Sequence, residues 1–275
     1  MGERYSRNEA LFGRDGQARI GATKVAIMGL GGLGAPLAQQ LAYLGVLDFA
    51  CVDFDVVTAS SLNRLIGAIP EDVAGATPKV TVADRTIKAI NPEAVVQRII
   101  GKCSDEDGVA AVARADVVFG CLDRDVQRLT LTEITSGMAK PYFDLATDTS
   151  GPDKDLCYGG RVLFCDGTRC LVCLDELDQR AMALDRMTRG DGAAHERIYG
   201  VGRDALDGTG PSVVSINGVV ASLAVTEFMT HVTGLRHPFA KLTYRADQGV
   251  VKKSDDKPAP GCYYCTAIWG KNVAM

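Results

Sequence analysis

The chain has 275 residues, enough for one large domain or two small ones and for a sizeable buried core. Hydrophobic residues make up 47% and charged residues 23%, as in a typical soluble globular protein, so disorder, collagen and coiled coil are excluded as its main character. With 30 Lys and Arg against 34 Asp and Glu, the formal charge is -4. No basic patch indicates nucleic-acid binding, so we expect a small-molecule or protein partner.

From Lys24 onward, short apolar runs alternate with helix-length segments, which is typical of a parallel sheet covered by helices. Helices are expected at 35–44, where Gly45 would end the helix, and at 78–90, where Pro78 suits the first turn. The pattern therefore predicts a doubly wound, Rossmann-like α/β unit. Its five strands are expected at 24–28, 49–54, 94–100, 116–121 and 141–145.

Beyond Leu145 the pattern changes. The stretch 147–157 is polar and rich in turn residues, and a short strand returns at 161–165. The stretch 174–210 is charged and poorly periodic, which in a compact protein is typical of a lid or a mobile segment. The remaining elements expected are a long apolar helix at 211–230 and two short extended runs around 242–244 and 249–251.

A glycine-rich loop, GLGGLG at 29–34, follows the first predicted strand and opens a helix, which is the context of a dinucleotide-binding fingerprint. Such glycines let backbone N–H groups approach phosphate oxygens at a helix N-terminus. Asp53 ends the second predicted strand, where a carboxylate can accept both ribose hydroxyls. The loop does not distinguish NAD, FAD and ATP, and a plain tight turn is the alternative. The four candidate glycines are Gly29, Gly31, Gly32 and Gly34.

Four charged residues favour phosphate chemistry over hydride transfer. In an open parallel sheet, ligands lie beyond the carboxyl ends of the strands, where Asp53, Arg64 and Lys79 can gather with Asp123. Arg and Lys would clamp a polyphosphate, and a carboxylate would hold Mg²⁺. A hydride-transfer site needs no such clamp. Each residue alone is weak evidence, so the joint arrangement carries the prediction.

Two C-x-x-C pairs predict a metal site. Cys170 and Cys173 form one pair, and Cys262 and Cys265 form the other. Four thiolates in two such pairs suit tetrahedral Zn²⁺ in a closed structural site that would tie the tail to the sheet. The long insert leaves two unrelated pairs of buried thiols as the alternative.

The sequence shows few targeting signals. No run reaches the about 18 apolar residues of a membrane span, and the first residues lack the apolar stretch of a signal peptide. Nine cysteines without a secretory signal indicate a reducing compartment, so a cytoplasmic location is expected. Gly2 fits the loose myristoylation pattern, which many unmodified proteins match by chance.

These motifs occur in the order found in the ubiquitin-activating-enzyme-like adenylyltransferases of the ThiF/MoeB/HesA type, which the chain resembles. The resemblance runs from the opening RYSR at 4–7 to Cys265. Its other elements are the FG and GQ pairs at 12–13 and 16–17, the glycine loop, DFD at 53–55, LNR at 62–64, PK at 78–79, INP at 90–92 and the thiol pairs.

The resemblance implies one adenylation domain over residues 1–275. Its nucleotide-binding core would cover about 20–145, a crossover lid about 174–210, and a C-terminal helix with a zinc knuckle about 211–265. The implied cofactors are ATP, Mg²⁺ and Zn²⁺. The implied state is a homodimer.

By the same resemblance, Asp53 holds the ribose, Arg64 and Lys79 hold the phosphates, and Asp55 and Asn63 complete the nucleotide contacts. Together with the four glycines, these are the expected cofactor-binding residues.

The resemblance also implies that Asp123 binds Mg²⁺ and that Arg7 reaches the phosphates of the neighbouring subunit. Arg7, Arg64, Lys79 and Asp123 are thus the expected catalytic residues. The four paired cysteines would ligate Zn²⁺.

Members of this family make the C-terminal glycine carboxylate of a ubiquitin-like or sulfur-carrier protein attack the α-phosphorus of ATP. The products are an acyl-adenylate and pyrophosphate. Mg²⁺ and cations must offset the repulsion between carboxylate and triphosphate, and the site must align the attack. A Gly-Gly tail has no side chains, so it could pass through a narrow channel beneath the lid.

The sequence departs from the family at three places. Ser61 and Arg124 each stand where the family usually has Asn, and Asp207 stands near the position of a thioester- or persulfide-forming cysteine. The chain is therefore expected to stop at the adenylate, passing it to a separate thiol-bearing acceptor. Cys157 is the best-placed substitute thiol, and His195 in the lid could assist.

Three other functions stay open. The acceptor could be a peptide C-terminus or a small carboxylate, because the lid sets the acceptor. The chain could also be an ATP-binding pseudoenzyme that serves as a partner subunit. An NAD-dependent oxidoreductase is the remaining alternative.

Overall fold

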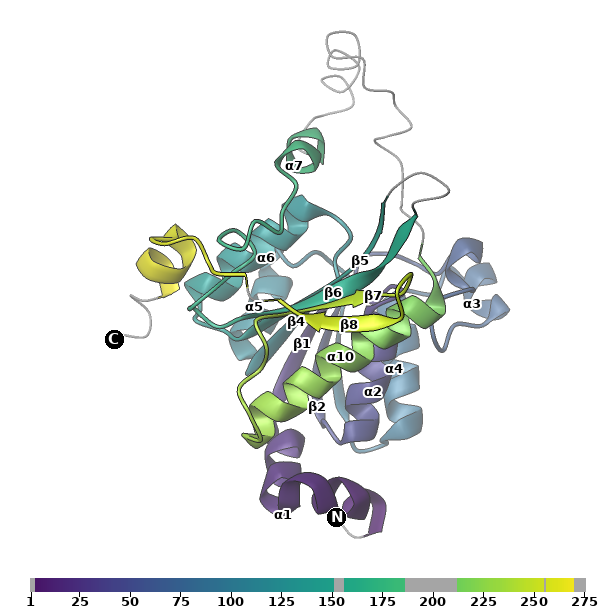
Figure 1. Cartoon of the computed structure of the whole chain (residues 1–275). Coiled ribbons are helices and arrows are strands. Elements are labelled where there is room, and N and C mark those ends of the chain that lie inside the picture. The colour runs from purple at the N-terminus through teal and green to yellow at the C-terminus, as the bar shows by residue number, and fades with distance from the viewer. Residues whose placement is uncertain (1–2, 151–155, 186–211, 255, 270–275) are drawn as a thin grey trace, which may run out of the picture.

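The computed structural model describes residues 3–150, 156–185, 212–254 and 256–269 (Figure 1). An eight-stranded sheet has the order β3-β2-β1-β4-β5-β6-β7-β8. Neighbours from β3 to β5 pair in parallel, and those from β5 to β8 are antiparallel. The strands are β1 (Lys24–Met28), β2 (Asp48–Val52), β3 (Val95–Ile99), β4 (Val117–Gly120), β5 (Tyr142–Ser150), β6 (Cys157–Cys165), β7 (Lys241–Arg245) and β8 (Val250–Lys253).

Helices cover both faces of the parallel part, which explains why its strands are nearly continuous apolar runs. In β1, Val25 and Ile27 face one core with Phe49, while Ala26 and Met28 face the other. The first core is covered by α1 (Ser6–Ala22), α2 (Gly34–Leu44), α4 (Lys79–Ile90) and α10 (Val214–Thr233). The second is covered by α5 (Glu106–Arg114) and α6 (Asp125–Gly137).

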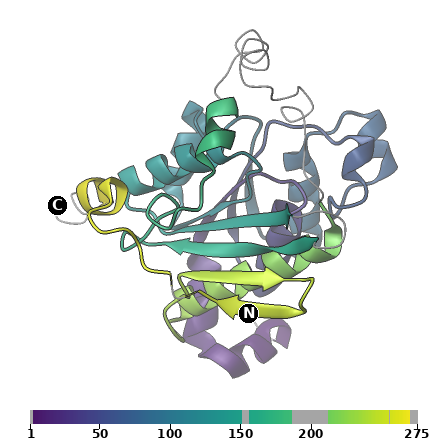
Figure 2. The ribbon, with the colours of Figure 1, turned by 45° about the horizontal axis from the view of Figure 1, so that its top comes forward.

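Shorter elements complete the described chain. They are helices α3 (Pro70–Ala74) and α7 (Gln179–Asp185), the single 3-10 turns η1 (Glu3–Tyr5) and η2 (Ala59–Ser61), and the short π-helix η3 (Tyr263–Trp269). In both views α1 lies at the end of the molecule opposite α7 (Figures 1 and 2). None of the helices in the described ranges is both long and apolar enough to cross a membrane.

The doubly wound α/β prediction is confirmed. Strand β1 begins and ends as predicted, and α2 and α4 agree to within one residue. The helix expected at 211–230 begins at Val214 and continues to Thr233; Pro211 lies outside the described residues. Helices α1, α5 and α6 are additions to the predicted set.

The prediction of a polar, turn-rich stretch at 147–157 is wrong for its first four residues. Strand β5 continues to Ser150 and pairs with β6 over nine residues, from Tyr142 opposite Cys165 to Ser150 opposite Cys157. An antiparallel hairpin tolerates polar side chains on its solvated face, so the strand lacks the apolar signature of a buried one. Figure 2 shows this hairpin beside the one formed by β7 and β8.

The first part of the segment predicted as a lid is packed against the protein. Leu174, Leu177 and Met182 are buried in the core beneath α6, and α7 lies within this part. Residues 186–211, including His195 and Asp207, lie outside the described residues.

Candidate active site

The strand order reverses between β1 and β4, because β2 and β3 lie on one side of β1 while β4 and β5 lie on the other. Ligands of open α/β sheets bind beside such a switch point, at the carboxyl ends of the strands. The glycine loop lies there. The Gly29 N–H donates to the Val52 carbonyl at 2.8 Å, and the Cys121 N–H donates to the Met28 carbonyl at 2.8 Å. These bonds fix the loop between the ends of β2 and β4.

Neighbouring backbone leaves no room for a side chain at two glycines of the loop. Gly29 has φ +93°, and a Cβ there would lie 2.5 Å from the Cys121 carbonyl oxygen. A Cβ on Gly34 would overlap the Gly29 carbonyl oxygen. A Cβ on Gly31 would meet no atom within 4 Å, so this glycine borders open space. Nothing in the fold demands glycine at Gly31, whereas close approach of a phosphate would.

This contrast gives a paired prediction. We expect Gly34→Ala to lower the free energy of unfolding by about 1–3 kcal/mol, because the added carbon must displace backbone. Gly31→Ala should leave the melting temperature unchanged but weaken ATP binding about tenfold or more. Thermal unfolding and titration calorimetry with Mg-ATP measure both quantities. Equal ATP affinity in Gly31→Ala and the unsubstituted chain would contradict a phosphate position at Gly31.

Asp53 lies against the glycine loop. Its Oδ2 accepts the Leu30 N–H at 2.6 Å, and its Oδ1 accepts the Asp55 N–H at 2.8 Å. Burial raises the pKa of Asp53, and the charge of Lys79 and both backbone hydrogen bonds limit the rise. Each carboxylate oxygen retains capacity to accept a further hydrogen bond, as ribose recognition requires.

Lys79 and Asp55 form an ion pair beside Asp53. Lys79 Nζ lies 2.6 Å from Asp55 Oδ2, and the Lys79 N–H donates to the Asp55 carbonyl at 3.0 Å. A bridge between Val56 and Pro78 brings the two segments together. The predicted phosphate cation therefore lies next to the predicted ribose carboxylate.

Arg64 also reaches the loop. Its Cδ would lie 3.3 Å from a Cβ on Gly32, while its guanidinium donates to the Ser60 carbonyl and to Asn63 Oδ1. Ser61, which stands where the family usually has Asn, has a structural role. Its buried hydroxyl accepts the Thr58 N–H at 3.2 Å and caps η2.

Asp123 lies on the loop between β4 and α6, two residues after Cys121. Its side chain is exposed. The structure thus brings six of the predicted segments to one edge of the sheet: the glycine loop, Asp53, Asp55, Asn63–Arg64, Lys79 and Asp123.

Arg7 is not part of this edge in its own chain. It is exposed on α1, which leads into the amino end of β1, opposite the glycine loop. The structure therefore does not bring Arg7 to the glycine loop of its own chain.

The sequence analysis missed a buried network behind Asp123. Arg128 donates to both carboxylate oxygens of Asp144, which has no solvent exposure, and to Asp125 Oδ1 at 2.6 Å. The Tyr142 hydroxyl donates to Asp144 at 2.6 Å. Burial acts against the charge of Arg128, but Asp144 raises its pKa overall. The network fixes the first turn of α6, which directly follows Asp123.

We expect Arg128→Met to lower the free energy of unfolding by about 3–5 kcal/mol, because it leaves Asp144 buried without its charge partner. The double substitution Arg128→Met with Asp144→Leu should recover most of that loss. Urea unfolding measures both. A loss below about 1 kcal/mol in the single variant would show that the pair is not the anchor of α6.

The packed start of the lid segment is held by charges. Glu176 pairs with Arg161 Nε at 2.7 Å and with Lys241 Nζ at 2.5 Å, and the Asp178 N–H donates to Asp125 Oδ2 at 2.7 Å. These contacts tie residues 176–178 to β6, β7 and α6. The described start of the segment predicted as a lid is therefore fixed to the sheet and to α6.

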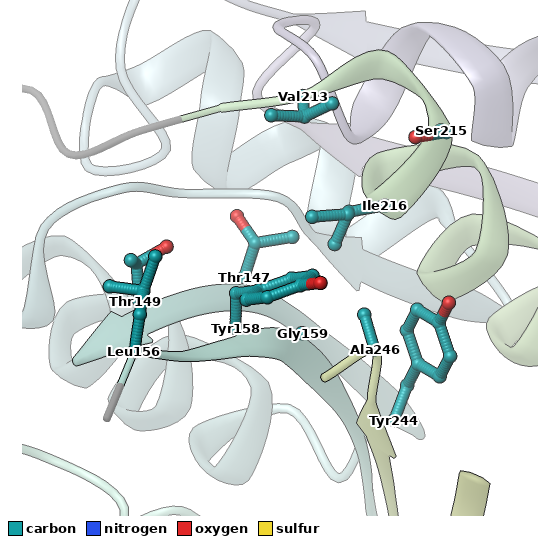
Figure 3. A pocket seen from close by; sticks show the side chains of 10 residues that line it. All are labelled: Thr147, Thr149, Leu156, Tyr158, Gly159, Val213, Ser215, Ile216, Tyr244 and Ala246. Atoms are coloured by element: carbon teal, nitrogen blue, oxygen red, sulfur yellow. The ribbon is translucent and has the colours of Figure 1, made fainter. Parts of the chain in front are cut away.

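A cavity of about 570 Å³ opens between the β5–β6 hairpin, the end of β7 and the first turn of α10 (Figure 3). None of the described side chains that line it is charged, and Tyr158, Ile216 and Tyr244 are among its large side chains. The described residues that line it are Thr147, Thr149, Leu156, Tyr158, Gly159, Val213, Ser215, Ile216, Tyr244 and Ala246.

The four paired cysteines converge as predicted. Their Sγ atoms all lie within 4.8 Å of one another, with Cys170 at 3.8 Å from Cys173 and 3.6 Å from Cys262. A tetrahedron with Zn–S bonds of about 2.3 Å places sulfur atoms about 3.8 Å apart. The cluster therefore fits a zinc ion. Hydrogen bonding between the two thiols lowers the pKa of Cys173 and raises that of Cys170.

The cluster joins distant parts of the chain. The Ala259 N–H donates to the Cys173 carbonyl at 2.8 Å, and the Tyr264 hydroxyl donates to Glu133 on α6 at 3.0 Å. The site thus holds η3 against α6, away from the glycine loop.

The other thiols are less suited to chemistry. Burial raises the pKa of the Cys121 thiol, which favours its unreactive protonated form. Cys157 begins β6, and its Sγ accepts a hydrogen bond from Arg245 at 3.1 Å. It lies beside the cavity but not at the glycine loop.

The chain is similar to known adenylyltransferases. The chain is 35% identical over 179 residues to the molybdopterin-synthase adenylyltransferase of Escherichia coli, covering 63% of this chain and 68% of that one. It is 39% identical over 131 residues to the sulfur carrier protein ThiS adenylyltransferase of the same organism, covering 46% and 50%. The aligned region spans about half the length of several such curated relatives.

The fold has close counterparts among solved structures. The E. coli MccB structure with MccA-N7isoASN superposes with a TM-score of 0.74 at 19% identity, covering 96% of this chain and 75% of that one. At that identity the likeness shows the fold. A sequence profile described as the ThiF family matches residues 5–260, and the chain therefore belongs to the ThiF family.

Proposed function

We propose that this chain uses ATP to adenylate the C-terminal glycine carboxylate of a ubiquitin-like or sulfur-carrier protein. The observation that carries the proposal is the joint placement of Asp53, Arg64, Lys79 and Asp123 around the glycine loop. Adenylation of a carrier is also the activity in the names of curated relatives.

ATP would bind along the edge of the sheet. Asp53 would accept the ribose hydroxyls, and the N–H groups of the loop and of α2 would face the phosphates. Arg64 and Lys79 would donate further hydrogen bonds to phosphate oxygens while they keep their contacts with Asn63 and Asp55. Asp55 and Asn63 would then hold the two cations in position. Cations preorganised around a transferring phosphoryl group stabilise the charge of the transition state.

In the reaction, a carboxylate oxygen of the carrier forms a bond to the α-phosphorus. The bond from that phosphorus to the oxygen bridging to the β-phosphate breaks, and pyrophosphate leaves with the electron pair. The carboxylate is ionised at neutral pH, so no proton has to move in this step. The enzyme's task is to align the attack and to neutralise charge.

Two metals fit the residues present. Asp123 offers an exposed carboxylate beside the loop, an oxygen ligand of the kind that Mg²⁺ takes, and bound Mg²⁺ would neutralise phosphate charge. The four-cysteine cluster would hold structural Zn²⁺. The exposed Arg7, remote from its own loop, would act on the site of a second chain in a homodimer.

The carrier tail would reach the loop past the uncharged cavity at α10. No described cysteine lies at the glycine loop with a reactive environment, so we propose that the adenylate passes to a separate thiol-bearing protein. The whole chain would act as a single adenylation domain in the cytoplasm.

The test is ATP–pyrophosphate exchange with the purified chain, with and without a ubiquitin-fold carrier ending in Gly-Gly. Exchange that requires the carrier supports the proposal. Exchange with a short peptide or small carboxylate alone would change the substrate class. ATP binding without any exchange would favour the pseudoenzyme.

A further inference from the structure

Asn217 on the first turn of α10 lies against the glycine loop, and the sequence analysis did not single it out. A Cβ on Gly32 would collide with Asn217 Nδ2 and would lie 3.1 Å from Ser212 Oγ and 3.3 Å from Arg64 Cδ. Three polar side chains from two distant segments thus converge on one point of the loop.

The two ends of the Asn217 carboxamide differ. The nitrogen donates to Ser212 Oγ at 3.0 Å. The oxygen has no hydrogen-bond partner among the described residues, although the side chain is 0% exposed. An unpaired buried acceptor costs about 1–3 kcal/mol, and nearly all buried polar groups in proteins are paired. Among the described residues, no donor reaches this oxygen.

The nucleotide phosphates do not supply that donor, because their ionised oxygens only accept hydrogen bonds. A peptide N–H does supply it. The cavity described above is lined by Val213, Ser215 and Ile216, which belong to the same helical turn as Asn217. An extended tail that crosses this uncharged cavity toward the loop passes the turn, and each of its backbone N–H groups needs an acceptor.

We propose that Asn217 Oδ1 accepts the N–H of the last residue of the acyl substrate. This inference rests on the proposed function and adds a residue to it. The bond would hold the terminal carboxylate beside the loop that binds the α-phosphate. Because the oxygen is closed to solvent in the free chain, the first turn of α10 would shift when the tail enters.

The inference makes stability and activity respond in opposite directions. Asn217→Leu has a similar shape but removes the unpaired oxygen, so we expect an unchanged or raised melting temperature and Mg-ATP affinity within about twofold. The KM for the acyl substrate should rise about tenfold, the loss expected for one hydrogen bond. A merely structural Asn217 would instead give a lower melting temperature and an unchanged KM.

The decisive test compares two ubiquitin-fold carriers. One ends in Gly-Gly, and the other ends in Gly-sarcosine, which lacks the last N–H. In pyrophosphate exchange, the sarcosine carrier should raise KM about tenfold with the unsubstituted enzyme. With Asn217→Leu, the sarcosine carrier should raise KM almost no further, because the sarcosine and the substitution remove the same hydrogen bond. Thr230→Val, a buried change on α10 remote from the loop, is the matched control and should keep the full sarcosine effect.

Equal sarcosine effects in the unsubstituted enzyme and Asn217→Leu would overturn the inference while leaving the proposed function intact. A lowered melting temperature in Asn217→Leu with unchanged KM would do the same. Absence of exchange by the unsubstituted enzyme with the Gly-Gly carrier would contradict the proposed function, and this inference with it.

Discussion

Asp123→Ala is expected to lower carrier-dependent pyrophosphate exchange by about a thousandfold or more while leaving the fold unchanged. A metal held by this carboxylate would contribute several kcal/mol of charge stabilisation, and each 1.36 kcal/mol is about tenfold in rate. The Asp123 side chain is exposed, so its removal should change the free energy of unfolding by less than about 0.5 kcal/mol.

Exchange kinetics at saturating ATP, with thermal unfolding of the same samples, separates these effects. Asp15→Ala is the matched control, because Asp15 is an exposed carboxylate on α1 at the opposite edge of the sheet. It should keep full activity. If Asp123→Ala retained more than about a tenth of the exchange rate, another group would have to provide the neutralising charge, and the proposed role of Asp123 would be wrong.

Cys173→Ser is expected to release one zinc ion per chain and to destabilise the fold strongly. Structural zinc contributes about 10 kcal/mol or more in small zinc domains. Even half of that would lower the melting temperature by about 10 °C or more, since a chain of this size loses about 2–4 °C per kcal/mol. Stability should fall because the cluster joins the buried segment around Leu171 to η3.

Metal analysis of the purified chain and thermal unfolding with and without chelator measure this prediction. Cys157→Ser, which changes a thiol outside the cluster, should keep both the metal and the melting temperature. Below the melting temperature, Cys173→Ser should still bind ATP, because the cluster contributes no residue to the glycine loop. A metal-free chain with normal stability would instead support two pairs of packed thiols.

Much of the parallel half of the fold could be predicted from the sequence. Strand β1 lies between helices on both faces, so the four residues from Val25 to Met28 form an unbroken apolar run with clear ends. The glycine loop and the two C-x-x-C pairs are local patterns whose chemistry depends on spacing, and the structure confirms the convergence of the four thiols. Family membership follows from the order of these local patterns.

The antiparallel half was harder to predict. The outer part of β5 carries Thr147, Asp148 and Thr149, which resemble a loop in sequence but pair with β6 in the fold. Their strand conformation depends on hydrogen bonds to a partner strand, which no local pattern records. The cavity beside α10 exists only because that hairpin extends beyond the core.

The sequence by itself determined which residues gather at the candidate nucleotide-binding edge, because a glycine loop and carboxylates that follow strands must meet at the carboxyl ends of a parallel sheet. Only the tertiary structure showed that Arg128 and Asp144 anchor the Asp123 turn and that Asn217 faces Gly32. These residues are far apart in the chain, and their types are common in any protein. Burial is what makes them informative, because an unpaired polar group costs free energy only where water is excluded.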